Sequence, residues 1–294
     1  MAGKEFYDLA EAQLNLSSHS KSYWGNLGLW RADTPAAQQD YAQACTRLAK
    51  LVGDLAQLNP QDQVIDIGFG CGDQLLLWLQ DYAVEQLYGL NISSSQTQLS
   101  QQRLAEAGFC QQAQQCRQGS YADMLKWASS TLSAPPSKII ALDCAYHFRD
   151  RQQFLAHSHT LLAPQGQTVL CDLLLGSNTL SLKNRLVLKT LCRVCNIPYK
   201  NLLKKVHYMA RCEALGFEVV DFIDITEHVF LPFGEWLYTY RHAHCDKGLH
   251  WGKYTGTAWF LRWAKQQGIL RYVVVNLRKK WFLFTFNLNL LLNH

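Results

Sequence analysis

The feature that most constrains this chain is the segment VIDIGFGCGDQ, residues 64–74. An apolar run encloses an acid, and glycines then occupy every second position, at Gly68, Gly70 and Gly72. A buried strand, a tight turn and the first turn of a helix produce such a pattern. Glycine is needed where any Cβ atom would keep the backbone from approaching a ligand. The segment therefore predicts a nucleotide-type binding loop.

The residues around this loop alternate between strand and helix patterns. A helix is expected over 35–58, because Thr34-Pro35 is a good cap and first-turn pair and Asn59-Pro60 marks a stop. Further strands are expected at 87–90, near 116, and at 138–142, 168–173, 217–223 and 271–277, with helices from 73 and at 94–107, 151–162, 180–191, 201–215 and 257–267. This alternation predicts an α/β fold whose parallel sheet is covered on both faces.

Two stretches, 174–205 and 225–268, do not fit the alternation, and we expect them to form a substrate lid. With 294 residues, the chain is long enough for one large α/β domain with insertions. The expected division is an N-terminal lid and helix at 1–58, a core at 59–173 and 206–280 that carries the lid insertions, and an apolar C-terminal tail at 281–294.

The loop departs from a dinucleotide fingerprint, because G-x-G-x-x-G starting at Gly68 would require glycine where the chain has Asp73. Its D-x-G-x-G-x-G form, with the strand and helix before it, resembles the first motif of the class I S-adenosylmethionine-dependent methyltransferases. The order of elements extends the resemblance over about residues 20–280. The resemblance implies a Rossmann-like, doubly wound, seven-stranded and mostly parallel sheet with helical lid insertions, and S-adenosyl-L-methionine as the cofactor.

The same resemblance implies which residues contact the cofactor. The glycine loop faces the methionine part and the ribose, with Asp66 orienting the turn, and Asn91 stands where most relatives place an acid. An asparagine still accepts one hydrogen bond and donates another. The form G-[IVL]-N-[IL]-S-x-x-Q resembles the branch with sterol, cyclopropane and other small-molecule methyltransferases. The implied cofactor contacts are Asp66, Gly68, Gly70, Gly72, Asn91, Ile92, Gln96, Ser120, Tyr121 and Asp143.

Two of the candidate regions also have a purely structural interpretation. Ser120 and Tyr121 follow the third strand, where the family contacts adenine, but Ser-x-x-Asp is also an ordinary helix cap. His147 follows the fourth strand, at the carboxyl edge where ligands bind in such sheets, and it is the candidate general base. The alternative is a histidine at the start of a helix that is hydrogen-bonded to backbone.

Aromatic side chains dominate the expected acceptor side. Nine of them lie in the thirty-one residues from Phe230 to Phe260, inside the second lid insertion, and such walls suit an apolar or planar acceptor. Core packing is the other meaning of such a cluster. If the methyl group went to the carbon of an alkene, Glu235 or Asp224 would take the proton. The expected acceptor contacts are Tyr23, Trp30, Tyr146, Phe148, Phe233 and Trp236.

Composition narrows the partners and the compartment. The net charge of +5 is mild, and the basic residues are spread out apart from Lys204-Lys205 and Arg278-Lys279-Lys280, so no nucleic-acid partner is expected. Ten scattered cysteines and a polar N-terminus without a signal peptide favour a cytoplasmic protein. No metal is expected, because Cys192-x-x-Cys195 lacks a second pair, and no carboxylate or cysteine spacing completes a site at His157-x-His159 or His242-x-His244.

The apolar tail WFLFTFNLNLLLNH, residues 281–294, is too short to span a bilayer as a helix. It is compatible with an extra edge strand, with a weak membrane-surface anchor behind the basic cluster at 278–280, or with a non-native extension.

The sequence as a whole favours a methyltransferase that acts on a small, fairly apolar or lipid-like acceptor, with oxygen preferred over carbon or nitrogen. An RNA or protein methyltransferase is the first alternative, although the chain lacks an N-P-P-Y-type tetrapeptide after the fourth strand. A non-catalytic binding module is the second, since a cofactor loop does not prove an acceptor site. A nicotinamide dehydrogenase is disfavoured by Asp73 and Asn91 together.

Overall fold

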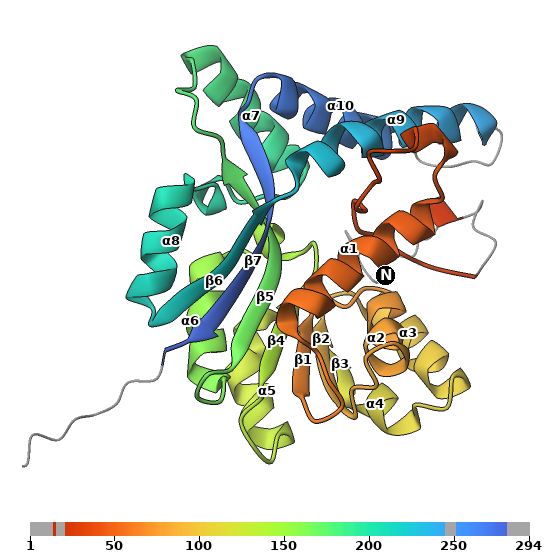
Figure 1. The fold of residues 1–294 in the computed structure, drawn as a ribbon, viewed down its shortest axis with the longest axis vertical. Coiled ribbons are helices and arrows are strands. Elements are labelled where there is room, and N and C mark those ends of the chain that lie inside the picture. The colour runs from red at the N-terminus through yellow and green to blue at the C-terminus, as the bar shows by residue number, and fades with distance from the viewer. Residues whose placement is uncertain (1–13, 16–20, 245–250, 281–294) are drawn as a thin grey trace, which may run out of the picture.

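The computed structural model describes residues 14–15, 21–244 and 251–280, which form a seven-stranded sheet between helical layers (Figure 1). The strand order is β3-β2-β1-β4-β5-β7-β6. Strands β1 to β5 pair in parallel, whereas β7 is antiparallel to its neighbours β5 and β6. The doubly wound, mostly parallel sheet is thereby confirmed. The strands are β1 (Gln63–Ile67), β2 (Gln86–Asn91), β3 (Cys116–Gln118), β4 (Lys138–Ala141), β5 (Gln167–Leu175), β6 (Phe217–Asp224) and β7 (Leu270–Lys279).

Two apolar cores lie on opposite faces of the sheet. Side chains alternate along β5, so that Leu173 belongs to one core and Leu174 to the other. The first core includes α1 (Tyr41–Ala56), α2 (Asp73–Gln80), α3 (Ser94–Glu106), α4 (Cys110–Gln115), α7 (Leu182–Val194), α9 (Phe230–Ala243) and α10 (Trp251–Gln266). The second includes α5 (Met124–Thr131), α6 (Arg151–Leu161) and α8 (Lys205–Ala214).

Most expected elements are present within a few residues of their expected bounds. The helix expected over 35–58 instead begins at Tyr41, because the Asp40 side chain accepts a hydrogen bond from the Gln43 N–H and caps it. Residues 36–38 form a separate 3-10 turn before that cap. Helices α4, α5 and α9 were not expected from the sequence pattern. The predicted apolar tail at 281–294 lies outside the described residues.

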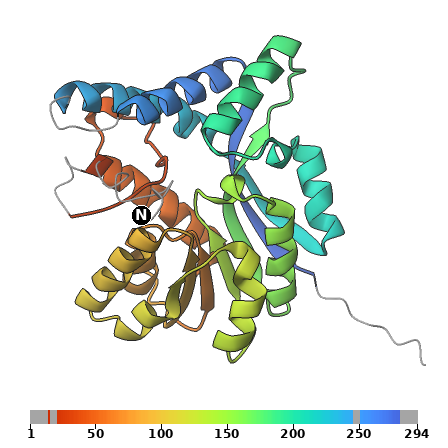
Figure 2. The ribbon, with the colours of Figure 1, turned by 180° about the vertical axis from the view of Figure 1, so that it is seen from behind.

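The two insertions lie beyond the carboxyl ends of the parallel strands. In Figures 1 and 2, α7, α9 and α10 run across the end of the sheet toward which β4 and β5 point. Ligands of doubly wound proteins bind at this edge. The position of the insertions therefore fits the lid that the sequence predicts.

None of the helices in the described ranges has the length and apolar character needed to cross a membrane.

A buried ion pair joins the second helical layer to the sheet. Arg151 on α6 donates to Asp172 on β5 over 2.7 Å, and both side chains are at most 3% exposed. Arg151 also donates to the Asn201 carbonyl, and the Asn201 amide donates to the Phe148 carbonyl at 2.6 Å. The pair thus also supports the loop that follows β4.

We expect Arg151→Leu to lower the free energy of unfolding by about 3–5 kcal/mol, because it leaves the Asp172 carboxylate buried without its cation. The double variant Arg151→Leu with Asp172→Leu should recover most of this loss. Lys50→Leu, which breaks the exposed pair with Asp81, should cost about 1 kcal/mol or less. Urea unfolding of the three variants measures these differences, and equal losses for Arg151→Leu and Lys50→Leu would contradict the argument.

Candidate active site

The glycine loop between β1 and α2 has the conformation that its sequence predicts. Gly68, Gly70 and Gly72 have φ angles of +80°, +57° and +91°, which glycine adopts without steric cost. A Cβ at Gly68 would lie 2.8 Å from Cys144 Sγ, and one at Gly72 would lie 2.6 Å from Ser100 Oγ. A Cβ at Gly70 would meet no atom of the described residues within 4 Å. Gly68 and Gly72 thus allow close packing, and Gly70 presents its backbone to open space.

Asp66 lies beneath the loop and fastens it to α2. Its oxygens accept hydrogen bonds from Gln74 Nε2 at 2.8 and 2.9 Å and from Trp78 Nε1 at 2.7 Å. The carboxyl group is fully buried, and this burial raises its pKa to about 6 despite the donors. Asp66 therefore holds the glycine loop in position against α2. We expect it to act on a cofactor through the position of the loop backbone.

The end of β2 combines a buried amide with an exposed apolar side chain. Asn91 is 4% exposed, and its NH₂ group donates to Gln96 Oε1 at 3.2 Å and to the Ser93 carbonyl at 3.4 Å. With its donors used in this way, the Asn91 carbonyl oxygen is left to act as an acceptor. Ile92, the next residue, is 62% exposed. The predicted Gln96 therefore orients Asn91 in this structure.

Ser120 serves as a helix cap in this structure. Its hydroxyl accepts from the Ala122 N–H and donates to Asp123 Oδ2, whose carboxylate accepts from the Ser120 N–H in turn. Tyr121 stacks on Phe148 with ring centroids 4.6 Å apart, and its hydroxyl accepts from the Asp150 N–H. The cap interpretation is thus observed, and contact of Ser120 or Tyr121 with adenine stays a prediction.

Asp143 joins three distant parts of the chain at the end of β4. Its backbone is left-handed, with φ +53°, and Oδ2 accepts from the Leu27 N–H at 2.8 Å. Oδ1 accepts from the Tyr146 hydroxyl at 2.7 Å and from the hydroxyl of Tyr272 on β7. Burial next to this carboxylate raises the pKa of Tyr272 far above its usual range, so the phenol stays a donor. The sequence offered no signal for Tyr272, which lies 129 residues from Asp143.

The N-terminal segment 21–30, called the strap below, is held at two points. The Tyr23 N–H donates to both oxygens of Asp73, at 3.1 and 3.2 Å, and the Leu27 N–H is the Asp143 donor described above. Arg103 binds Asp73 with both terminal nitrogens and lies 4.9 Å from the Tyr23 ring centroid. Asp73, whose presence excluded a dinucleotide loop, therefore anchors the strap to the glycine loop.

His147 links the loop after β4 to the first lid insertion. Its ring lies 4.3 Å from that of Tyr146, and Nδ1 lies 3.2 Å from the carbonyl oxygen of Asn196. A carbonyl only accepts, so Nδ1 carries the proton in this contact, and the lone pair of the neutral imidazole belongs to Nε2. The backbone hydrogen bond of the structural interpretation is present, and it is also the contact that would orient a general base.

The predicted aromatic acceptor contacts are largely packed against one another. Trp30, Phe233 and Trp236 are 1%, 3% and 4% exposed. Trp236 stacks on Tyr41 at 4.7 Å and on Tyr240 at 4.6 Å between ring centroids. In the described residues this cluster builds the junction of the strap, α1 and α9. Acceptor contact by Trp30, Phe233 or Trp236 stays a prediction.

Comparison with known proteins identifies the family. Residues 37–228 match the family model described as a methyltransferase domain, which is well over half of the chain. The chain belongs to this methyltransferase family. Within the described ranges, no group of three or more His, Cys, Asp or Glu side chains could hold a metal ion in this methyltransferase.

Individual relatives are more distant. Over 149 residues the methyltransferase is 26% identical to erythromycin 3''-O-methyltransferase of Saccharopolyspora erythraea, covering 51% of this chain and 45% of that protein. Its fold matches a geranyl diphosphate C-methyltransferase of Streptomyces coelicolor, with a TM-score of 0.68 and 15% identity over 95% of this chain and 100% of that one. A cyclopropane synthase of Mycobacterium tuberculosis matches with a TM-score of 0.70 and 16% identity over 92% and 94%. At such low sequence identity, these two structural matches establish a shared fold and nothing beyond it.

The family and the fold make S-adenosylmethionine the cofactor, as the glycine loop predicts. The residues present fit it. Gly70 leaves the loop backbone open, Asn91 keeps a buried acceptor oxygen suited to a ribose hydroxyl, and Ile92 offers an exposed apolar surface suited to adenine. Asn91 ends β2, and Gly70 and Ile92 follow the carboxyl ends of the neighbouring strands β1 and β2.

We expect Gly70→Val to abolish binding of S-adenosylhomocysteine, because the new side chain would fill the open space beside the loop. Gly108→Val is the matched control, since Gly108 also has a positive φ and a Cβ there would meet no described atom within 4 Å, yet it lies between α3 and α4. Both variants should lose about 1–2 kcal/mol of stability from backbone strain. Calorimetric titration distinguishes them, and equal affinities would refute the assignment of Gly70.

A second prediction concerns Asp66 and pH. A carboxyl group whose pKa is about 6 when folded and about 3.9 when unfolded contributes stability that is fully present below pH 4 and lost as the pH rises through 6. Asp66→Asn does not titrate. Its deficit relative to the wild type should therefore shrink by roughly 2 kcal/mol between pH 4 and pH 7. Urea unfolding at both pH values measures this, with Leu104→Ala as a buried, non-titrating control whose deficit should stay constant.

Proposed function

We propose that this methyltransferase transfers the methyl group of S-adenosylmethionine to a hydroxyl oxygen of a small, fairly apolar acceptor. The observation that carries the oxygen assignment is the contact between His147 Nδ1 and the Asn196 carbonyl, which puts the proton on Nδ1 and the basic lone pair of the imidazole on Nε2. The relative named erythromycin 3''-O-methyltransferase supports a small-molecule acceptor and an oxygen nucleophile.

The loop that carries the candidate base touches the cofactor loop through Cys144. Strands β1 and β4 pair directly, and Cys144 Sγ donates to the Ile67 carbonyl at 3.0 Å, so the loops that follow the two strands touch. The same Cys144 side chain is the one that a Cβ at Gly68 would strike. His147, three residues farther along, therefore follows a segment whose position is set by the cofactor loop.

The cofactor, when bound, supplies a methyl group on a cationic sulfur that leaves readily. The protein's own contribution is then alignment, exclusion of water and removal of one proton. His147 removes the proton of the acceptor hydroxyl. The strap, held by Asp73 and Asp143, excludes water from the edge of the sheet. The Tyr146 ring, which lies against that of His147, suits an apolar acceptor. Contact of the acceptor with Phe148, whose ring stacks on Tyr121, is part of the same proposal.

The carbon-methylation alternative receives less support. It required Glu235 or Asp224 as the proton acceptor. Glu235 is exposed on α9, whereas Asp224 pairs with Arg271 at 3.5 Å and accepts from the Thr226 N–H. Solvent exposure of Glu235 and the pairing of Asp224 with Arg271 make both carboxylates poor candidates for a base beside the cofactor, which favours the hydroxyl acceptor.

The proposal predicts that His147→Ala lowers kcat by about 10²–10⁴-fold while S-adenosylhomocysteine affinity changes little. The decisive variant is His147→Asn, whose amide can still donate to the Asn196 carbonyl but has no basic nitrogen. If His147 is the base, His147→Asn is as slow as His147→Ala. Recovery of activity in His147→Asn would show that the hydrogen bond alone matters and would remove the base assignment.

The assay follows S-adenosylhomocysteine formed with fractionated small-molecule extracts, and mass spectrometry of the methylated product identifies the bonded atom. An N- or C-methyl product would contradict the oxygen assignment. Binding of the cofactor without turnover of any fraction, or labelling of macromolecules only, would instead favour the non-catalytic or the RNA and protein alternatives.

A further inference from the structure

The mild net charge of the chain conceals a strong local concentration of positive charge. The chain has 28 Lys and Arg and 23 Asp and Glu; residues 173–212 hold eight of the former and none of the latter, so the remainder has 20 against 23. Basic residues are therefore less evenly spread than composition led us to expect. The eight are Lys183, Arg185, Lys189, Arg193, Lys200, Lys204, Lys205 and Arg211, all exposed.

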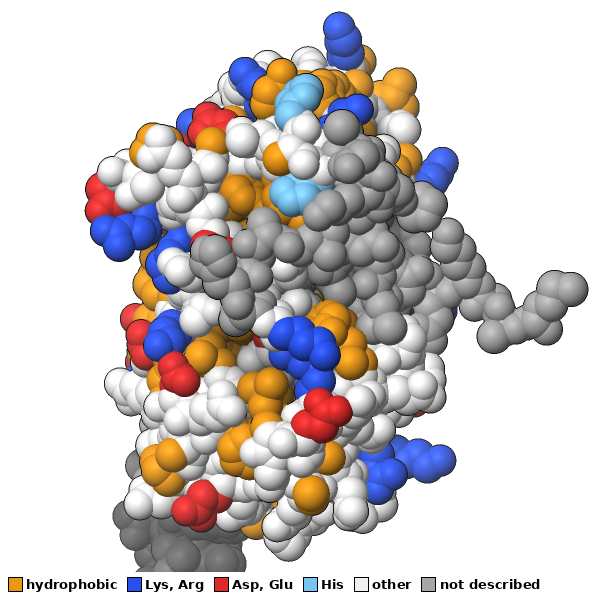
Figure 3. All heavy atoms as spheres, turned by 90° about the vertical axis from the view of Figure 1, so that its right-hand side faces the viewer, with side chains coloured by type: hydrophobic (Ala, Val, Ile, Leu, Met, Phe, Trp, Pro, Cys, Tyr) orange, Lys and Arg blue, Asp and Glu red, His pale blue; other side chains and the backbone are white. Residues whose placement is uncertain are grey.

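These cations are almost entirely unneutralised. Among the described residues, Lys200 is the one of the eight that forms an ion pair, with Asp150 at 2.8 Å. Lys189 and Lys205 instead lie over the rings of Tyr199 and Phe222. On the side of the molecule shown in Figure 3, by contrast, acidic and basic side chains are interspersed. The positive charge thus belongs to one corner of the fold.

Exposed apolar side chains are interleaved with this charge on α7. Leu182, Leu186 and Val194 are 83%, 68% and 70% exposed. Helical spacing places Leu182, Leu186 and Arg193 on one side, away from the buried Leu188. Exposed leucines of this size are costly in water unless something covers them. Helix α7 therefore has two apolar faces. One packs against the core, and the other is exposed and also carries basic residues.

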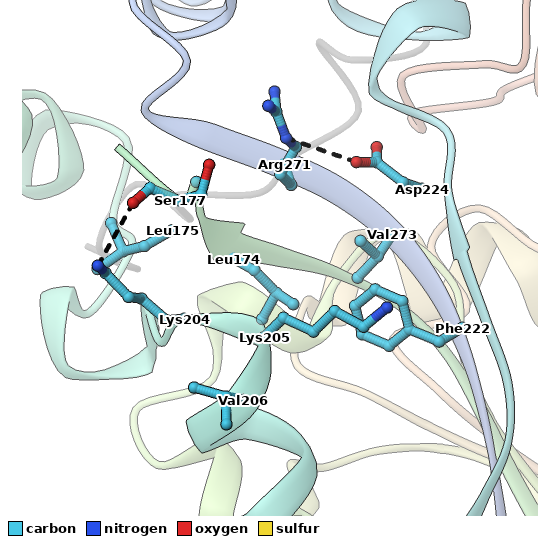
Figure 4. A pocket seen from close by; sticks show the side chains of 11 residues that line it. Leu174, Leu175, Ser177, Lys204, Lys205, Val206, Phe222, Asp224, Arg271 and Val273 are labelled. Atoms are coloured by element: carbon cyan, nitrogen blue, oxygen red, sulfur yellow. Dashed lines mark hydrogen bonds and ion pairs between the residues drawn. The ribbon is translucent and has the colours of Figure 1, made fainter. Parts of the chain in front are cut away.

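Two hollows meet at Lys204, and the second of them borders α7. One, of about 420 Å³, has Leu174, Phe222 and Val273 in its lining and carries Lys204, Lys205 and Arg271 (Figure 4). The other, of about 280 Å³, is lined by Arg185, Lys189 and Lys204 among others. In the first hollow Arg271 pairs with Asp224, whereas Lys204 donates to the Ser177 carbonyl at 3.5 Å and pairs with none of the carboxylates that the structure describes. Each hollow is lined partly by apolar side chains and carries cationic side chains that could bind an anion.

We propose that α7 and the adjoining Lys204–Lys205 corner dock on an anionic phospholipid bilayer. The cations pair with lipid phosphates, which settle over the two hollows, and Leu182 and Leu186 enter the boundary of the acyl region. This combination singles out a lipid surface, because a nucleic acid would use the cations and leave the leucines in water. A second copy of this corner would bring like charges together, and the tail 281–294 contains no acid to offer them.

Docking would place the lid insertion, rather than the glycine loop, against the lipid. The same insertion carries Asn196, the hydrogen-bond partner of His147. An acceptor dissolved in the bilayer would thus reach the protein on the side of the candidate base. The docking itself depends on the surface alone and stands whether or not the proposed methyl transfer is correct.

The test is co-sedimentation of the full chain with vesicles of phosphatidylcholine alone or mixed equally with phosphatidylglycerol, at roughly 0.1 M salt, where screening acts over about 10 Å. We expect strong preference for the anionic vesicles. The variant Lys183→Gln, Arg185→Gln and Arg193→Gln should reduce partitioning about a hundredfold. Its matched control, Lys50→Gln, Lys126→Gln and Arg262→Gln, removes the same charge from exposed sites elsewhere and should bind nearly as the wild type does.

A third variant, Leu182→Gln with Leu186→Gln, keeps every charge and should reduce partitioning about tenfold or more, whereas Tyr238→Gln, at another exposed apolar site, should not. Equal losses in the two charge variants would overturn the proposal in favour of unspecific attraction. No effect of the leucine variant would also overturn it, pointing to a soluble anion or an acidic protein. Gly70→Val should still bind vesicles, which separates this result from failure of the methyl-transfer proposal.

Discussion

The arrangement of the candidate site depends on the hydrogen bonds that the Asp143 carboxylate accepts. It accepts hydrogen bonds from the strap, from Tyr146 beside His147, and from Tyr272 on the antiparallel strand β7. The three donors that the structure describes, a backbone amide and two phenols, fix both oxygens of this carboxylate in place. The left-handed backbone at Asp143 turns the chain sharply after β4 and directs the next residues along the sheet edge.

The elements around this carboxylate have different roles. The glycine loop and the end of β2 supply the open backbone and the buried acceptor that suit the cofactor. The insertion 174–205 supplies the carbonyl that orients His147 and, on its outer face, the cations and leucines proposed to contact lipid. The aromatic residues of α9 pack with the strap and α1, so the second insertion holds the lid together.

Local sequence patterns predicted the core elements well, because each depends on neighbouring residues. The spacing of Gly68, Gly70 and Gly72 requires a turn that only glycine forms easily. The strands β1, β4 and β5 are mostly apolar and buried along nearly their whole length because both of their faces are covered. Prediction was weaker where a single side-chain hydrogen bond decides where an element begins or what a residue contacts. The start of α1 depends on the Asp40 cap, and the cap at Ser120 could not be distinguished from a cofactor contact by its spacing alone.

The sequence by itself therefore determined the α/β class, the family and the cofactor, since these follow from backbone conformations that local residue types impose. The tertiary structure decided what the side chains do. Asp66 is held by Trp78, Asp73 anchors the strap, Tyr272 meets Asp143, and Trp236 is buried, because each of these contacts joins residues that only folding brings together. The basic corner was present in the sequence as separate lysines and arginines. They form one surface only because folding brings the basic side chains of α7 close to Lys204 at the start of α8.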